Sequence, residues 1–193
     1  MIAGRKLRIE TGKVAKQAAG AVVVTYADTV VLAAVITGPP REGVDFFPLT
    51  VDYREKTYAA GKFPGGFFKR EARPTQKEIL TMRMIDRPLR PMFPTGYVDE
   101  VLIQAMVLAT DQENEPDILA MLGASAALCV SQLPFEGPSA ACRVAYVEGE
   151  YVLNPTLKQL EFATMEMVLA GHKDALNMIE VGAMEVSEQV VSD

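Results

Sequence analysis

This chain of 193 residues, 49% of them hydrophobic, is long enough to bury a core, so its composition excludes a disordered region. It has no apolar leader and no apolar run long enough to cross a bilayer, so we expect a cytoplasmic protein without a membrane partner. The net charge of −6 disfavours nucleic acid, but residues 1–90 carry 16 basic and 9 acidic side chains, against 3 and 16 in residues 91–193. This asymmetry predicts a basic working face and an acidic remainder that solubilises the protein or faces a partner.

The first quarter of the chain has the pattern of β-strands. Residues 7–10 form a short predicted strand, and the β-branched residues 20–26 (GAVVVTY) form a longer one. A turn at residues 27–29 leads into residues 30–36 (VVLAAVI), which predicts a hairpin. Residues 45–53 alternate in polarity and predict a further strand.

A helix with a clear N-terminal signal follows a basic loop. Thr75 precedes Glu78 by three residues, which is the spacing of a capping box. Because proline ends or kinks a helix, we expect this one to end near residue 86 or 87, before Pro88.

The rest of the chain alternates predicted strands and helices. The pattern predicts a strand over residues 100–109 and two hairpins, 140–147 with 151–153 and 164–170 with 176–181. It also predicts a largely apolar helix over residues 117–132, with Pro116 at the first helical position. A short helical turn covers residues 156–161, and residues 183–191 begin a helix that the sequence end cuts short. We therefore expect a fragment of a longer protein. The pattern predicts one α+β domain, with a sheet covered by two main helices.

Residues 54–90 contain ten basic and only four acidic side chains. Phe67 and Phe68 lie inside this run, directly after Gly65-Gly66. Lysines and arginines hold phosphates and aromatic rings stack on bases, so the stretch suits a single-stranded polyanion. The alternative is a solvated loop whose phenylalanines pack in the core. The residues expected to line the site are Phe67, Phe68, Lys69, Arg70, Arg73, Arg83, Arg87 and Arg90.

Motifs for catalysis and metal binding are absent from the sequence, so we expect no catalytic residue, metal site or cofactor in this chain. The acidic run Asp111, Glu113, Glu115 and Asp117 suits either a divalent cation or a helix N-terminus, and we favour the helix. Cys129 and Cys142 lie in apolar contexts, which predicts reduced core thiols.

Three long segments carry a family resemblance. They are DFFPLTVDYREKTYAAGKFPGGFFKREARPTQKEILTMRMIDRPLRPMFP (residues 45–94), NEPDILAMLGASAAL (114–128) and LPFEGPSAACRVAY (133–146). With shorter matches up to residue 171, they resemble the first core domain of bacterial polynucleotide phosphorylases over almost the whole chain. The resemblance implies that residues 1–193 form one RNase PH-like α+β domain, similar to ribosomal protein S5 domain 2, with a mixed sheet and packed helices.

The resemblance implies that the full-length protein forms a homotrimeric ring. This ring would degrade RNA from its 3′ end with phosphate, release nucleoside diphosphates in mRNA turnover, and polymerise RNA in reverse. The implied partners of this chain are single-stranded RNA and the second core domain of the same polypeptide. That second domain would bind Mg²⁺ and inorganic phosphate, so the full-length protein would be the nucleotidyltransferase and this domain alone inactive.

Two departures from the family's motifs matter. The channel loop, usually Phe-Phe-Arg-Arg, contains Lys69 in place of the first arginine, which loses a planar hydrogen-bonding fork. The helix start that binds phosphate in the catalytic copy is here Asn114-Glu115-Pro116-Asp117, whose carboxylates would repel phosphate. Arg83 and Arg87 match arginines that face RNA. The alternatives left open are a free-standing RNase PH-type phosphorolytic exoribonuclease and a purely structural ring subunit.

Overall fold

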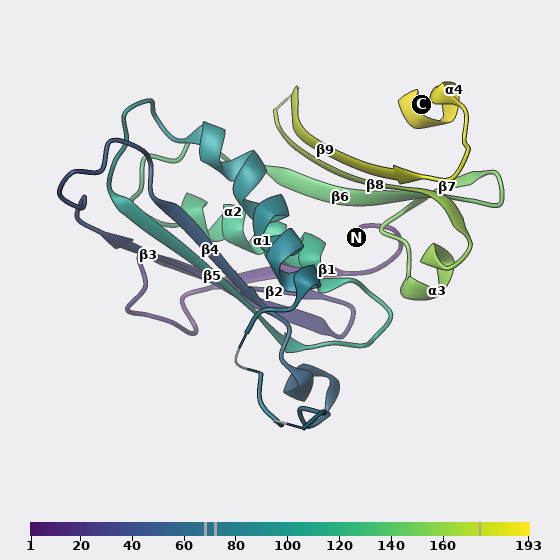
Figure 1. Cartoon of the computed structure of the whole chain (residues 1–193), viewed down its shortest axis with the longest axis horizontal. Coiled ribbons are helices and arrows are strands. Elements are labelled where there is room, and N and C mark those ends of the chain that lie inside the picture. The colour runs from purple at the N-terminus through teal and green to yellow at the C-terminus, as the bar shows by residue number, and fades with distance from the viewer. Residues whose placement is uncertain (68, 72, 174) are drawn as a thin grey trace.

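The computed structural model describes residues 1–193 except 68, 72 and 174. Two sheets enclose the two main helices, α1 (Gln76–Leu89) and α2 (Pro116–Cys129), as Figure 1 shows. The sequence predicted a mixed sheet with packed helices, and the first sheet is mixed. It did not show that the hairpins of the second half pair with each other in a sheet of their own.

The first sheet has the strand order β1-β2-β3-β5-β4. Its strands are β1 (Leu7–Thr11), β2 (Gly20–Tyr26), β3 (Thr29–Gly38), β4 (Leu49–Arg54) and β5 (Glu100–Ala109). All neighbours are antiparallel except β4 and β5, which run parallel and are connected through α1. The strand predicted from residue 45 begins only at Leu49, directly after Pro48, which has no backbone N–H for the ladder.

The second sheet has the order β7-β6-β8-β9 and is antiparallel throughout. Its strands are β6 (Ala140–Val147), β7 (Glu150–Leu153), β8 (Ala163–His172) and β9 (Ala175–Ala183). Two short helices flank it, α3 (Leu157–Leu160) and α4 (Glu188–Ser192). The predicted final helix therefore starts five residues late, because β9 extends to Ala183.

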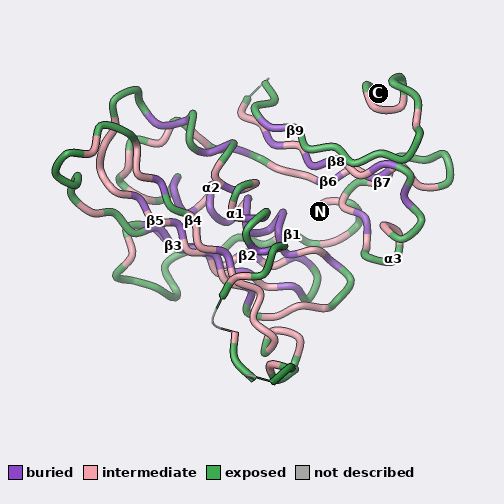
Figure 2. Tube along the Cα trace, viewed as in Figure 1, coloured by how far each residue is buried: buried purple, intermediate pink, exposed green. Residues whose placement is uncertain are grey.

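Small residues let α2 lie directly on the first sheet. A Cβ atom on Gly123 would lie 3.0 Å from Ala33 Cβ and 3.2 Å from Val24 Cγ2, so a larger residue would push the helix away from β2 and β3. The buried residues gather in the helices and on the strands that face them (Figure 2).

α1 begins as predicted and ends later. Thr75 and Glu78 form the capping box, with Glu78 N donating to Thr75 Oγ1. The helix continues through Pro88 and passes into a 3₁₀ turn, η2 (Arg90–Met92). Pro88 and Leu89 are both buried, and their contacts with the core offset the backbone hydrogen bond that proline cannot make.

Cys129 is exposed and Cys142 is half-buried, so the prediction of two core thiols is wrong. Both residues are free cysteines, and burial raises the pKa of each thiol. Cys129 is the last residue of α2. In the described part of the chain, no helix is long and apolar enough to span a bilayer.

Candidate nucleic-acid interface

The basic loop, residues 61–75, connects a 3₁₀ helix, η1 (Thr57–Ala60), to α1. It projects beyond the end of the first sheet (Figure 1). Its described residues are exposed or half-buried (Figure 2). Lys69, Arg70 and Arg73 are exposed. The side chain of Phe67 is 95% exposed, so this residue does not pack in the core. Phe68 lies outside the described residues.

A second aromatic residue of the basic loop escaped the sequence analysis. Phe63 is 93% exposed and follows Lys62 directly, so it has the same basic and aromatic surroundings as Phe67. Its position two residues before Gly65-Gly66 could have indicated from the sequence that Phe63, like Phe67, lies in the basic loop. The basic loop therefore presents two exposed rings among its basic side chains, which suits stacking on unpaired bases.

The exposed face of α1 forms one wall of a cleft of about 720 Å³. Arg83 and Arg87 are one helical turn apart on this face, as predicted. Arg87 Nη1 lies 2.5 Å from Glu180 Oε2 on β9, in an ion pair that is half exposed. Among the described residues, no carboxylate lies within ion-pairing distance of Arg83, so its guanidinium is more available to a phosphate than that of Arg87.

Arg90 is placed differently from Arg83 and Arg87. Its guanidinium makes a two-point contact with Asp86, at 2.9 and 2.6 Å, and donates to the backbone oxygens of Phe47 and Leu49. It also lies over the Phe47 ring, 5.6 Å from its centre. These contacts join the end of α1 to the start of β4, away from the lining of the cleft.

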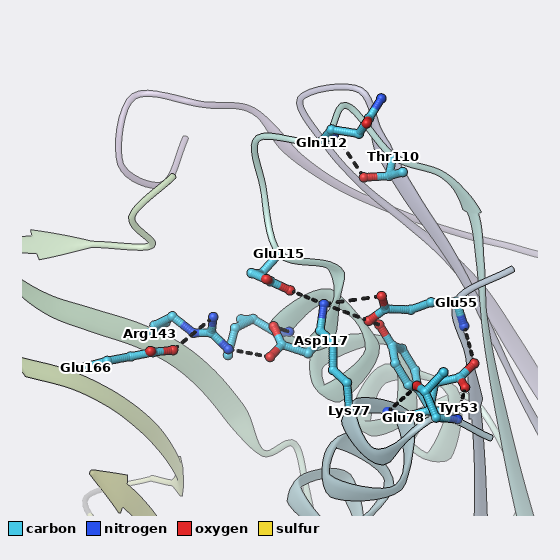
Figure 3. A network of polar contacts seen from close by, with 12 residues as sticks. Tyr53, Glu55, Lys77, Glu78, Thr110, Gln112, Glu115, Asp117, Arg143 and Glu166 are labelled. Carbon is cyan, nitrogen blue, oxygen red and sulfur yellow. Dashed lines mark hydrogen bonds and ion pairs between the residues drawn. The ribbon is translucent and has the colours of Figure 1, made fainter. Parts of the chain in front are cut away.

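Facing α1, the floor of the cleft contains a buried ion pair. The Arg143 guanidinium on β6 donates to Asp117 at the start of α2, and its Nη1 lies 3.1 Å from Glu166 Oε1 on β8 (Figure 3). The Asp117 side chain is almost fully buried, and burial raises its pKa while Arg143 opposes the increase. The pair joins α2 to the second sheet.

The N-terminus of α2 offers no open site for an anion. Pro116 has no backbone N–H, and Asp117 Oδ1 accepts the N–H of Ile118 at 2.7 Å. Glu115, the residue before the helix, accepts from Lys77 Nζ at 2.8 Å. The helix dipole, which could attract phosphate, is thus met by this chain's own carboxylates.

Lys77 connects the cleft with the root of the basic loop. Its Nζ lies between Glu115 and the Glu55 carboxylate, 3.2 Å away, and Tyr53 Oη donates to Glu55 Oε1 at 2.6 Å (Figure 3). Burial would lower the pKa of Lys77, but Glu115 and Glu55 outweigh it and raise the pKa. Burial also raises the pKa of Tyr53, and Glu55 adds to the effect.

The acidic run therefore does not converge. Asp111 accepts three hydrogen bonds, two from the backbone N–H groups of residues 113 and 114 and one from the Asn114 side chain. Glu115 pairs with Lys77, and Asp117 pairs with Arg143. In the described parts of the chain, no three His, Cys, Asp or Glu side chains are close enough to hold a metal ion. The network of Lys77, Asp117 and Arg143 was missed, although one arginine within an apolar strand, AACRVAYV, signals a buried partner.

The sequence matches both domain models of one family. The model described as "3′ exoribonuclease family, domain 1" matches residues 3–134, and the one described as domain 2 of that family matches residues 137–193.

Curated relatives agree with this assignment. Polyribonucleotide nucleotidyltransferases of Rhodopseudomonas palustris (strain HaA2) and Nitrobacter winogradskyi are each 57% identical to the chain over 189 residues. These alignments cover 97% of the chain and 26% of each relative, so the chain spans about a quarter of their length.

Solved structures give the fold independently of close sequence similarity. A structure titled as the Archaeoglobus fulgidus exosome with RNA bound to the active site matches with a TM-score of 0.76 at 18% identity, covering 97% of this chain and 82% of its own. Rice (Oryza sativa) Rrp46 matches with a TM-score of 0.76 at 16% identity, covering 100% and 86%. The predicted RNase PH-like α+β fold and the resemblance to polynucleotide phosphorylases are confirmed, and the chain belongs to the 3′ exoribonuclease family.

Proposed function

We propose that this chain is the RNA-holding first core domain of a polyribonucleotide nucleotidyltransferase and that it has no phosphorolytic centre of its own. The chain is 57% identical to relatives of that name, of which it spans about a quarter. The exposed Phe67 in the basic loop supplies a stacking ring, and Arg83 on α1, which has no carboxylate within ion-pairing distance among the described residues, supplies a phosphate contact.

One observation carries the non-catalytic part of the proposal. The start of α2, where a phosphate would meet helix N–H groups, is occupied by Asp117 and Glu115, which are paired with Arg143 and Lys77. A phosphate there would have to displace two ion pairs and approach two carboxylates. These residues do not fit inorganic phosphate or Mg²⁺, so we derive no chemical step through either.

Chemistry belongs, in this proposal, to the longer polypeptide. Its second core domain would hold Mg²⁺ and phosphate, and three polypeptides would form a ring that shortens RNA from the 3′ end, releases nucleoside diphosphates and serves mRNA turnover in the cytoplasm. The same protein would polymerise RNA in reverse. The Archaeoglobus fulgidus exosome, whose structure has RNA bound to the active site and shares this fold, supports an RNA-handling assembly.

The RNA-contacting set that we propose is Phe67, Phe68, Lys69, Arg70, Arg73, Arg83 and Arg87. Arg90 has less to contribute, because Asp86 and two backbone oxygens already engage its guanidinium. Lys69 supplies charge without the planar fork of arginine, so stacking and charge should dominate over sequence preference.

Filter binding of poly(A) by the purified chain over a series of salt concentrations tests the proposal. We expect measurable affinity whose logarithm falls linearly with the logarithm of salt concentration, by about 0.7 per phosphate contact. A purely structural ring subunit would show neither affinity nor slope. The control is Arg8→Ala, because Arg8 on β1 is exposed, pairs with Glu10 and does not line the cleft.

A further inference from the structure

The root of the basic loop is held by a buried carboxylate. Glu78, 5% exposed in the first turn of α1, accepts the backbone N–H of Glu55 at 2.9 Å through Oε1 and that of Thr75 at 2.6 Å through Oε2. Glu55 follows the end of β4, and Thr75 precedes α1. One side chain thus joins the point where the chain leaves the sheet to the point where it enters the helix.

A second carboxylate closes the loop further out. Glu71 Oε1 accepts the backbone N–H of Thr57 at 2.7 Å, and Lys56 Nζ donates to the backbone oxygen of Glu71 at 3.1 Å. The receiving side is itself fixed, because the N–H of Thr110 at the end of β5 donates to Ala59 in η1 at 3.0 Å. These contacts turn residues 57–71 into a closed loop tied to the sheet.

We propose that Glu71 is a positioning residue for RNA binding: its carboxylate clasps the basic loop to η1 and so holds Lys69 and Arg70 in place for the RNA. This inference rests on the function proposed above. Without the clasp, the loop would have to be ordered when RNA binds, and the conformational entropy lost would weaken binding.

Because Glu71 is negatively charged, the direction in which Glu71→Ala changes RNA affinity tests the proposal. A carboxylate next to Arg70 repels a phosphate backbone, so electrostatics alone predict that Glu71→Ala tightens RNA binding. Positioning predicts the opposite. Glu71→Gln removes the same charge but keeps an oxygen that can accept the N–H of Thr57, so it separates the two effects.

The experiment is filter binding of poly(A) by wild type, Glu71→Ala, Glu71→Gln and the control Glu42→Ala, whose side chain is exposed in another loop. We expect Glu71→Ala to bind about tenfold more weakly, the factor for about 1.4 kcal/mol of ordering. Glu71→Gln should match or exceed wild type, and all four should melt at the same temperature. Equal or tighter binding by Glu71→Ala, or an equal loss in Glu71→Gln, overturns the proposal.

Limited trypsin digestion reports the clasp without RNA. Trypsin cuts after Lys62, Lys69 and Arg70, which lie in the closed loop. Cleavage at these sites should be several-fold faster in Glu71→Ala than in wild type, Glu71→Gln or Glu42→Ala, because trypsin needs a locally unfolded chain and the clasp limits local unfolding of these exposed sites. A wild-type rate in Glu71→Ala contradicts the clasp. If wild type binds no RNA but Glu71→Ala is still cleaved faster than wild type, Glu71 holds the loop closed and the proposed RNA-binding function is wrong.

Discussion

Arg83 and Arg90 lie seven residues apart in one helical stretch, and their guanidinium groups have opposite surroundings. Arg83 has no carboxylate in ion-pairing reach among the described residues, whereas Arg90 contacts Asp86, two backbone oxygens and the Phe47 ring. Both were expected to line the RNA site from charge and spacing alone. Spacing gives the face of a helix and places Asp86 one turn before Arg90, but it does not show that the backbone oxygens of Phe47 and Leu49, far away in the sequence, also engage Arg90.

This difference predicts two separate outcomes. Arg83→Ala should weaken poly(A) binding and lower the salt slope by about 0.7, since one phosphate contact is lost, while stability to urea stays unchanged. Arg90→Ala should destabilise the fold by about 1–3 kcal/mol, because hydrogen bonds to a charged group are lost. Equal slopes for wild type and Arg83→Ala would assign Arg83 an internal role.

Phe67 gives a prediction at the same scale. Its ring is 95% exposed, so Phe67→Ala should leave the melting temperature unchanged and weaken single-stranded RNA binding by about 1–3 kcal/mol, the value of one base stack. Phe47→Ala is the contrasting variant, because Phe47 packs 4.6 Å from Phe93 between ring centres and should reduce stability. A large fall in melting temperature in Phe67→Ala, with unchanged affinity, would contradict this assignment.

Local signals predicted the helix starts and hairpins well. Thr75 and Glu78 marked the start of α1, and Pro116 marked that of α2, because capping is decided within a few residues. The predicted end of α1 was wrong. Burial of Pro88 and Leu89, which the local sequence does not reveal, outweighs the tendency of proline to end a helix. The second sheet was missed for a related reason, since strand pairing depends on distant partners.

The capping carboxylate of α1 gives a pH-dependent prediction. Burial raises the pKa of Glu78, but hydrogen bonds from Thr75 and Glu55 outweigh it, so the folded pKa lies below the ordinary 4.5. A lowered folded pKa stabilises the protein above the unfolded value, and this contribution is lost as pH falls through the folded pKa. Urea unfolding should show Glu78→Gln less stable than wild type at pH 7, with the difference shrinking below about pH 4.5. A difference that is constant with pH would contradict the role of the charge.

The buried pair between α2 and β6 predicts a strong asymmetry between single and double variants. Arg143→Met leaves the Asp117 carboxylate buried without its main partner, and should cost about 3–5 kcal/mol of unfolding free energy. The double variant Arg143→Met with Asp117→Leu removes both charges and should recover most of that loss. A double variant as unstable as the single one would show that the two residues act through packing instead of charge.

At the scale of the whole molecule, the two oppositely charged parts of the sequence meet across the cleft. Lys77, Arg83 and Arg87 come from the basic part, and Glu115, Asp117, Glu166 and Glu180 from the acidic part. The sequence predicted an acidic remainder that faces solvent or a partner. Two of its carboxylates, Glu115 and Glu180, instead pair with Lys77 and Arg87 of the basic part. Asp117 and Glu166 pair with Arg143, a cation of the acidic part itself. Composition could not show these pairs, because it contains no information on which elements face each other.

We propose that this chain holds RNA without a phosphorolytic centre of its own. Release of ADP from radiolabelled poly(A) by the purified chain, saturated with RNA and supplied with phosphate and Mg²⁺, tests this proposal. We expect the RNA to be bound and to stay intact. Phosphate-dependent release of ADP would contradict it, and would make the chain a complete RNase PH-type enzyme whose carboxylates near the start of α2 take part in the chemistry.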